Sequence, residues 1–166
     1  MDKWDLYDKD FQKVTTISEN DNIPLDLYHY TVNIWILNEE NHVLLLKNKL
    51  DSELYYPGFW GSLNGNVISD EKPLETCKRI LKDKLGISLI ENAIEKVDTV
   101  LRDPYQYIYE TYILKASINV DDLELSSEFS KAKLIDKKEL ENMIENGEIA
   151  PVLISRINKY VLPIIK

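Results

Sequence analysis

The chain opens with two short segments in which apolar and polar residues alternate. Trp4–Tyr7 and Phe11–Val14 lie on either side of the polar stretch 8–10. Alternation around a polar turn is typical of a β-hairpin with one buried face. The polar run 15–22 then predicts a surface loop, so residues 1–30 are expected to form an N-terminal hairpin and loop.

Apolar segments further along the chain predict the strands of the core. Tyr30–Leu37 is rich in β-branched and aromatic residues, and Val43–Leu46 follows it after a polar turn. We expect these two strands to pair with each other. Glycines within Phe59–Gly65 predict a bent strand. Three more strands are expected at Val97–Arg102, Tyr105–Ala116 and Lys131–Ile135.

The segment Pro73–Leu85 has a clear helical pattern. Proline suits the first turn of a helix, and Gly86 suits the position just after its end. The apolar residues recur at intervals of three and four, at Leu74, Cys77, Leu81 and Leu85. We therefore predict one amphipathic helix here.

Residues 136–166 are expected to form the C-terminal helices. Asp136 followed by Glu139 is an acidic capping-box pattern, and Gly147 marks the end of that helix. Pro151 opens a last helix that should end near Val161. The order of strands, helix, strands and helices predicts an α/β (α+β) sandwich, with residues 1–166 forming a single domain.

Composition and charge narrow the range of functions. The 166 residues are 44% hydrophobic and 30% charged, which is a globular balance. Acidic residues outnumber basic ones by 29 to 20, so we expect no binding to a nucleic-acid backbone. One cysteine, Cys77, cannot form an intrachain disulfide, and the sequence has neither an apolar leader nor a run of about 18 apolar residues. These features predict a cytoplasmic protein without a membrane partner.

One motif lies between residues 65 and 87. Gly65 is followed after five residues by Glu71 and after seven more by Arg79, and Gly86–Ile87 closes the frame. This spacing resembles the Nudix box of the Nudix hydrolase superfamily. Other segments resemble the branch of that superfamily that includes isopentenyl-diphosphate isomerase-like proteins: Trp4–Asp8, Tyr28–His29, Pro57–Trp60, Ser127–Phe129 and Leu134–Asp136.

The resemblance implies both a fold and a chemistry. It implies an α/β/α sandwich with a mixed sheet, in which the box forms a loop, a helix and a second loop. Relatives typically hydrolyse a diphosphate linked to a nucleoside or another group, using Mg²⁺ or Mn²⁺ held by glutamates of the helix. A phosphorylated small molecule is therefore the expected partner, and a homodimer is left open.

The chain departs from the family pattern at the metal-binding positions, so its box is degenerate. The family helix reads Arg, Glu, aliphatic, any residue, Glu, Glu, whereas this chain has Arg79, Ile80, Leu81, Lys82, Asp83 and Lys84. Positions 80 and 84 lie on one side of a helix, so an apolar side chain and an ammonium stand where a divalent cation is expected. The box holds five basic and four acidic residues, although the whole chain has a net charge of −9. Local charge thus opposes a cation.

Some carboxylates of the family site remain. By the resemblance, Glu71, Arg79 and Asp83 are the catalytic candidates, with Arg79 bracing a carboxylate. Asp83 and Glu71, together with Glu110 from a strand outside the box, are the candidates for holding a metal. A simpler interpretation is also open, because Glu75, Arg79 and Asp83 have the spacing of a solvated ion-pair ladder on a helix.

Lys84, Trp60 and His29 are the candidates for substrate binding. The Lys84 ammonium either occupies the place of the metal and binds a phosphate, or is a surface lysine. A base or an isoprenoid group could stack on Trp60 or on Tyr55 and Tyr56. His29 coincides with a metal-binding position of the isomerases, but a strand-edge histidine with a backbone partner is the other interpretation.

Three functions are compatible with these residues. Family descent favours a hydrolase acting on a nucleoside-diphosphate-type substrate, with activity weakened by the lost glutamates. The alternative is a non-catalytic sensor or binding module that holds a phosphorylated ligand through Lys84 and Arg79. An isopentenyl-diphosphate isomerase ranks last, because Asn64 and Asn66 stand where the isomerases carry a cysteine and a histidine.

Overall fold

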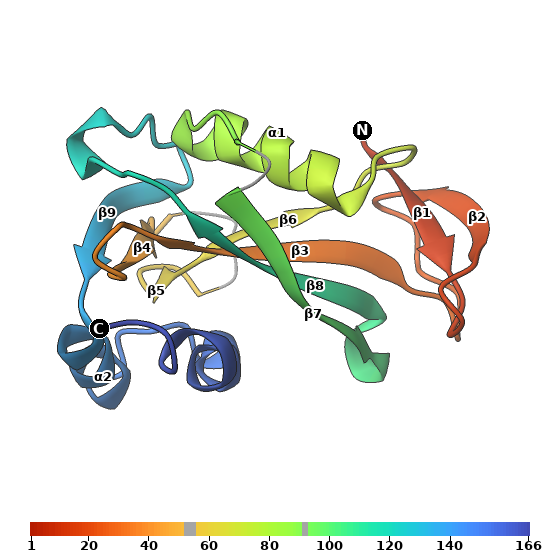
Figure 1. Cartoon of the computed structure of the whole chain (residues 1–166). Coiled ribbons are helices and arrows are strands. Elements are labelled where there is room, and N and C mark those ends of the chain that lie inside the picture. The colour runs from red at the N-terminus through yellow and green to blue at the C-terminus, as the bar shows by residue number, and fades with distance from the viewer. Residues whose placement is uncertain (52–55, 91–92) are drawn as a thin grey trace.

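The N-terminal residues form the predicted hairpin at one end of the molecule (Figure 1). The computed structural model describes residues 1–51, 56–90 and 93–166. Strands β1 (Lys3–Tyr7) and β2 (Lys13–Ser18) pair in antiparallel fashion. Residues 15–18 therefore belong to a strand and not to the expected loop. They include three β-branched residues, which favour a ladder with β1 over an irregular loop.

Seven strands among the described residues form a mixed sheet in the middle of the molecule. β3 and β8 run parallel, and the other pairs in the sheet are antiparallel. The strands are β3 (His29–Leu37), β4 (Val43–Asn48), β5 (Trp60–Gly61), β6 (Leu63–Asn66), β7 (Ile94–Arg102), β8 (Tyr107–Lys115) and β9 (Phe129–Ile135).

The neighbours of β3 differ from the sequence expectation. β3 and β4 share one residue pair, Leu37 with Val43, because β6 lies beside residues 31–34 of β3. β4 instead pairs along its length with β9. β6, which leads into the box, therefore lies next to β3, the most buried strand of the sheet.

Helices cover both faces of the sheet (Figure 1). α1 (Pro73–Leu85) packs on one face. α2 (Lys137–Glu145) and the C-terminal helical segment 151–161 pack on the other. The structure confirms the predicted α/β (α+β) sandwich with a mixed sheet.

Alternate residues of β3 contribute to the two apolar layers. Val32 and Ile34 belong to the cluster under α1, whereas Trp35 and Leu37 belong to the cluster under α2. A strand that is covered on both faces needs apolar residues at nearly every position. This requirement explains the almost continuous apolar run that predicted the strand.

The predicted helix signals lie where the sequence placed them. Pro73 is the first residue of α1, and Gly86 follows the helix with φ of 70°, a left-handed conformation that glycine adopts without strain. Asp136 caps α2, since its Oδ1 accepts a hydrogen bond from the backbone N of Glu139 at 2.8 Å. Both helices therefore match their predicted start and end signals.

The last helical segment changes character along its length. A 3₁₀ turn at Pro151–Leu153 leads into α3 (Ile154–Arg156) and then into a π turn at Ile157–Val161. The predicted start and end of this segment are confirmed, but the sequence did not predict its irregular winding. None of the helices in the described part of the chain is long and apolar enough to span a membrane.

Candidate functional site

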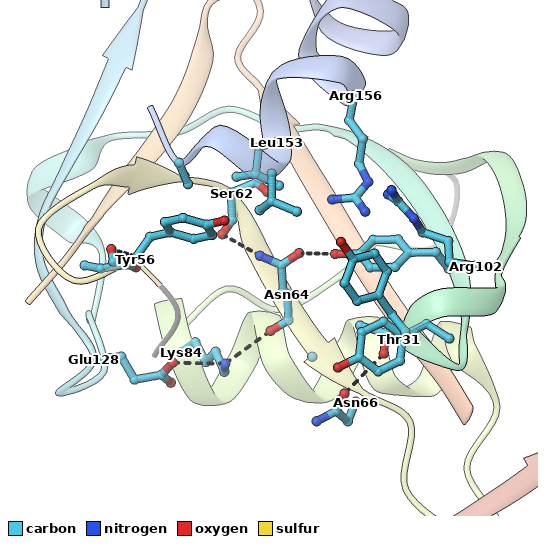
Figure 2. A pocket seen from close by; sticks show the side chains of 18 of the residues that line it. Thr31, Tyr56, Ser62, Asn64, Asn66, Lys84, Arg102, Glu128, Leu153 and Arg156 are labelled. Atoms are coloured by element: carbon cyan, nitrogen blue, oxygen red, sulfur yellow. Dashed lines mark hydrogen bonds and ion pairs between the residues drawn. The ribbon is translucent and has the colours of Figure 1, made fainter. Parts of the chain in front are cut away.

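A pocket of about 610 Å³ opens beside the C-terminal helical segment (Figure 2). Its walls come from all seven strands of the sheet, the end of α1 and the segment 151–161. Four of the described lining residues are charged: Lys84, Arg102, Arg156 and Glu128. Aromatic rings form much of the remaining surface: Tyr56, Tyr105, Tyr107, Tyr109 and Phe129. The described lining of the pocket is therefore aromatic and has more positive than negative side chains.

Lys84 lies at one end of this pocket. Its Nζ donates hydrogen bonds to the backbone carbonyl of Asn64 at 3.1 Å and to Oε2 of Glu128 at 3.2 Å (Figure 2). Glu128 is held in turn by Ser126, whose Oγ donates to Oε1 at 3.2 Å. The backbone N of Ser126 also donates to the carbonyl of Lys84. The ammonium thus lies between a backbone carbonyl and a carboxylate that is itself hydrogen-bonded by Ser126.

Glu71 and Arg79 form a separate ion pair outside the pocket. Arg79 donates to Glu71 from Nε at 2.9 Å and from Nη2 at 3.0 Å, and Nη2 also reaches the carbonyl of Asn66 at 3.0 Å. Thr76 Oγ1 donates to the same carboxylate. Burial alone would raise the pKa of Glu71, but the hydrogen bonds from Arg79 and Thr76 outweigh it and lower the pKa. This pair fixes the loop 66–71 against α1.

The three predicted metal ligands do not lie together. Asp83 is exposed on α1, and Glu71 is taken up by Arg79. Glu110 is buried on the α1 face of β8, where Tyr112 Oη donates to it at 2.5 Å and Lys96 Nζ lies 3.6 Å away. Among the described residues, no cluster of three histidine, cysteine or acidic side chains could hold a metal ion.

The two changed positions of the box do not present oxygen ligands either. Ile80 is fully buried in the apolar cluster under α1, and a Cβ on Gly65 would lie 2.8 Å from its Cγ2. Only glycine at position 65 allows this close approach without a shift. Lys84 adds an ammonium to the site, so the residues at these positions do not fit a divalent metal ion.

His29 lies in an aromatic stack and not in the pocket. Its ring stacks on Trp4 with centroids 4.1 Å apart and meets Tyr107 edge-on at 4.7 Å. Nε2 lies 3.3 Å from Oδ1 of Asn66. Burial lowers the pKa of His29 to about 4, so the ring is neutral near pH 7.

Trp60 also lies away from the pocket lining. Its ring packs against the apolar cluster under α2, and its backbone N donates to the carbonyl of Glu148 at 2.9 Å. Of the three predicted substrate-binding residues, Lys84 alone is part of the pocket. Tyr56 lines the pocket as well, whereas Tyr55 lies outside the described residues.

Sequence reasoning missed the two arginines of the pocket. The guanidinium of Arg156 lies over the ring of Tyr109, with Cζ 3.8 Å from the ring centroid, and Arg102 lies 5.6 Å from the centroid of Tyr105. Tyr109 Oη donates to Oδ1 of Asn64 at 3.1 Å, which links this end of the pocket to β6 (Figure 2). The sequence carried one indication of these two residues: arginine occurs three times, and lysine supplies the other basic residues.

Asp5 joins the N-terminal hairpin to the box loop. Its carboxylate accepts hydrogen bonds from Thr16 Oγ1 at 2.7 Å, Ser69 Oγ at 2.8 Å and the backbone N of Asp70 at 3.0 Å, and Lys13 Nζ lies 3.1 Å away. Burial alone would raise the pKa of Asp5, but these hydrogen bonds lower it to about 2. The hairpin is therefore part of the support of the box.

A mixed sheet between helical layers, with a glycine loop leading into an arginine-braced helix, defines a Nudix-type protein. The NUDIX domain model matches residues 27–153, and the chain belongs to this family. Members of the family generally use a divalent metal ion. Nudix hydrolase 3 of Arabidopsis thaliana is 32% identical over 77 residues, which are 46% of this chain and 10% of that protein. The chain thus spans about a tenth of the length of this curated relative.

Solved structures share the fold at low sequence identity. DR0079 from Deinococcus radiodurans has a TM-score of 0.75 and 17% identity, over 96% of this chain and 98% of that one. The NUDIX domain of Shewanella oneidensis NrtR, solved in complex with ADP ribose, has a TM-score of 0.55 and 19% identity, over 69% of this chain and 77% of that one. At these identities the likeness concerns the fold.

Proposed function

We propose that this chain binds a phosphorylated, nucleoside-type small molecule in its pocket without a divalent metal held by α1. The observation that carries the proposal is the position of the Lys84 ammonium, which is bonded to the carbonyl of Asn64 and to Glu128. Both groups are hard oxygen ligands of the kind that Mg²⁺ prefers. A cation that belongs to the protein already satisfies them, and a metal ion there would be repelled.

The charge and shape of the pocket support an anionic, partly aromatic ligand. Three basic side chains and one acidic side chain line it among the described residues, and Glu128 is already paired with Lys84. Tyrosine rings offer faces on which a base can stack. The NrtR NUDIX domain, which shares the fold, binds ADP ribose, a ligand of this chemistry. Without a metal-activated water, hydrolysis of the ligand is expected to be weak or absent.

A weakened hydrolase of nucleoside diphosphate-type substrates is the second candidate. Membership of the family favours it, and so does the retained Glu71–Arg79 pair, which holds the box loop on α1. In this case the remaining carboxylates would have to recruit a metal when substrate is bound. The two candidates differ in the expected effect of a chelator, which abolishes turnover by a metal-dependent hydrolase and leaves metal-independent binding unchanged.

The test compares binding and turnover of the native chain. Nucleoside and isoprenoid diphosphates are offered with Mg²⁺, with Mn²⁺ or with EDTA, binding is followed by calorimetry, and products are followed by chromatography. We expect binding in EDTA and no turnover under any condition. Turnover that EDTA abolishes would overturn the binding-module proposal in favour of the weakened hydrolase, and no binding to any compound would refute both.

A further inference from the structure

Two positive charges in the pocket, Arg102 and Arg156, have no carboxylate partner among the described residues. Arg156 is 8% exposed, and among the described residues no carboxylate lies within ion-pair distance of it or of Arg102. Glu128 is paired with Lys84, and Asp98 on neighbouring β7 is paired with Lys159. The described part of the chain therefore supplies no counter-charge for the two arginines.

A structural role explains only part of this arrangement. The contact of Arg156 with the ring of Tyr109 is a cation–π interaction, which offsets some of the cost of burying a guanidinium. It does not offset the repulsion from the half-buried Arg102, and burial of Arg156 together with this repulsion lowers the pKa of Arg156. An anion bound between the two guanidiniums would remove both costs.

The geometry separates these arginines from the Nudix helix. Figure 2 shows Arg102 and Arg156 at one end of the pocket and Lys84 with Glu128 at the other, with Asn64 between them. Arg102 lies at the end of β7, and Arg156 lies in α3 just before the π turn. Two planar guanidiniums that approach from different elements can each donate two hydrogen bonds to phosphate oxygens.

The use of arginine in this chain supports the same conclusion. Arginine occurs three times in the sequence, and lysine supplies the other basic residues. Arg79 holds the carboxylate of Glu71 with two hydrogen bonds, and the remaining two arginines face the pocket. The planar guanidinium of arginine can donate two parallel hydrogen bonds to a carboxylate or a phosphate, as Arg79 does to Glu71.

We propose that Arg102 and Arg156 form the phosphate site of this pocket, so that a nucleoside diphosphate lies with its diphosphate at this end and not against α1. The inference rests on the proposed function, since it assigns the position of the ligand that the pocket takes. The ligand would then lie in the opposite orientation to one whose diphosphate is held by a metal ion on α1. The phosphates would then lie next to two tyrosines beside Arg102. These are Tyr105 and Tyr107, whose rings stack with centroids 6.3 Å apart.

The experiment measures the affinity of ADP, inorganic pyrophosphate and adenosine in EDTA by calorimetry. The native chain is compared with Arg156→Gln, Arg102→Gln and the control Lys115→Gln, an exposed residue at the far end of β8. We expect each arginine variant to bind ADP and pyrophosphate about 10- to 100-fold more weakly, and adenosine unchanged. The control should bind all three compounds like the native chain.

The outcomes separate this inference from the proposed function. If the native chain binds ADP and the arginine variants bind it equally well, the phosphate site lies elsewhere and the inference is overturned, while the proposed function stands. If the native chain binds no phosphorylated compound, the proposed function fails and the inference fails with it. Arg156 is buried, so circular dichroism checks each variant, and the half-buried Arg102 keeps the test decisive if Arg156→Gln does not fold.

Discussion

Replacing Lys84 by glutamate tests whether its ammonium stands in for a metal ion. The Lys84 Nζ lies 3.2 Å from Glu128 Oε2, and the two side chains are 23% and 26% exposed. At an effective dielectric of about 20, the attraction of two charges 4 Å apart is about 4 kcal/mol before desolvation is counted. The variant replaces this attraction by repulsion between two carboxylates. We expect the free energy of unfolding in EDTA to fall by about 1–3 kcal/mol.

The same substitution places new oxygen atoms beside those that the ammonium contacted. Glutamate at 84, Glu128 and the carbonyl of Asn64 would then offer a divalent cation three hard ligands. A cation at about 100 times its dissociation constant stabilises the folded state by about 2.7 kcal/mol. Mn²⁺ should therefore restore most of the stability that Lys84→Glu loses, and it should leave the native chain unchanged.

Urea denaturation in EDTA and in MnCl₂ measures both effects. The matched control is Lys82→Glu, which makes the same charge change at an exposed position of the same helix. We expect the free energy of unfolding of the control to stay within about 0.5 kcal/mol of native in both buffers. The reasoning is refuted if Lys84→Glu is no less stable than the control, or if Mn²⁺ stabilises the two variants equally.

Three further predictions concern buried side chains. The pKa of Asp5 is about 2 in the folded protein and 3.8 for a free aspartate. The Asp5 carboxylate therefore adds about 2 kcal/mol to the free energy of unfolding above pH 4, and this contribution is lost as the pH falls towards 2. Acid denaturation of Asp5→Asn should lack this pH dependence, and an unchanged profile would contradict the assignment. Ile80→Ala should lower the free energy of unfolding by about 2–5 kcal/mol in urea, whereas a loss below 1 kcal/mol would mean that the residue is not core. Burial raises the pKa of Cys77 to about 12, so a thiol reagent should react with it in denaturant and not in the folded protein; rapid reaction in buffer would show that the cysteine is accessible.

Local signals in the sequence predicted local structure well. Pro73 and Gly86 marked the limits of α1, and Asp136 marked the start of α2, because caps depend on a few neighbouring residues. The sequence predicted the pairing of strands less well. β4 pairs with β9 and not along β3, since the choice of partner depends on long-range packing that a single segment does not encode.

The candidate site shows the same division. Glu110 was a candidate metal ligand because relatives often supply a further carboxylate from outside the box. The strand alternates between two faces, and the register of β8 against β3 turns Glu110 towards α1 and Tyr109 towards the pocket. Trp60 and His29 do not line this pocket. Residue type alone did not indicate this, since an aromatic ring can pack in a core as well as against a ligand.

By itself, the sequence determined the family frame and predicted a change in its metal-binding face. The spacing of Gly65, Glu71, Arg79 and Gly86 indicated a Nudix box. Ile80 and Lys84 led to the prediction that its helix lacks two of the usual metal ligands. Both are properties of one continuous helix and its loops, so local spacing reveals them. The tertiary structure alone brought two arginines from β7 and α3 together and bonded Lys84 to Glu128, because contacts between distant segments arise only when the sheet and its covering helices assemble.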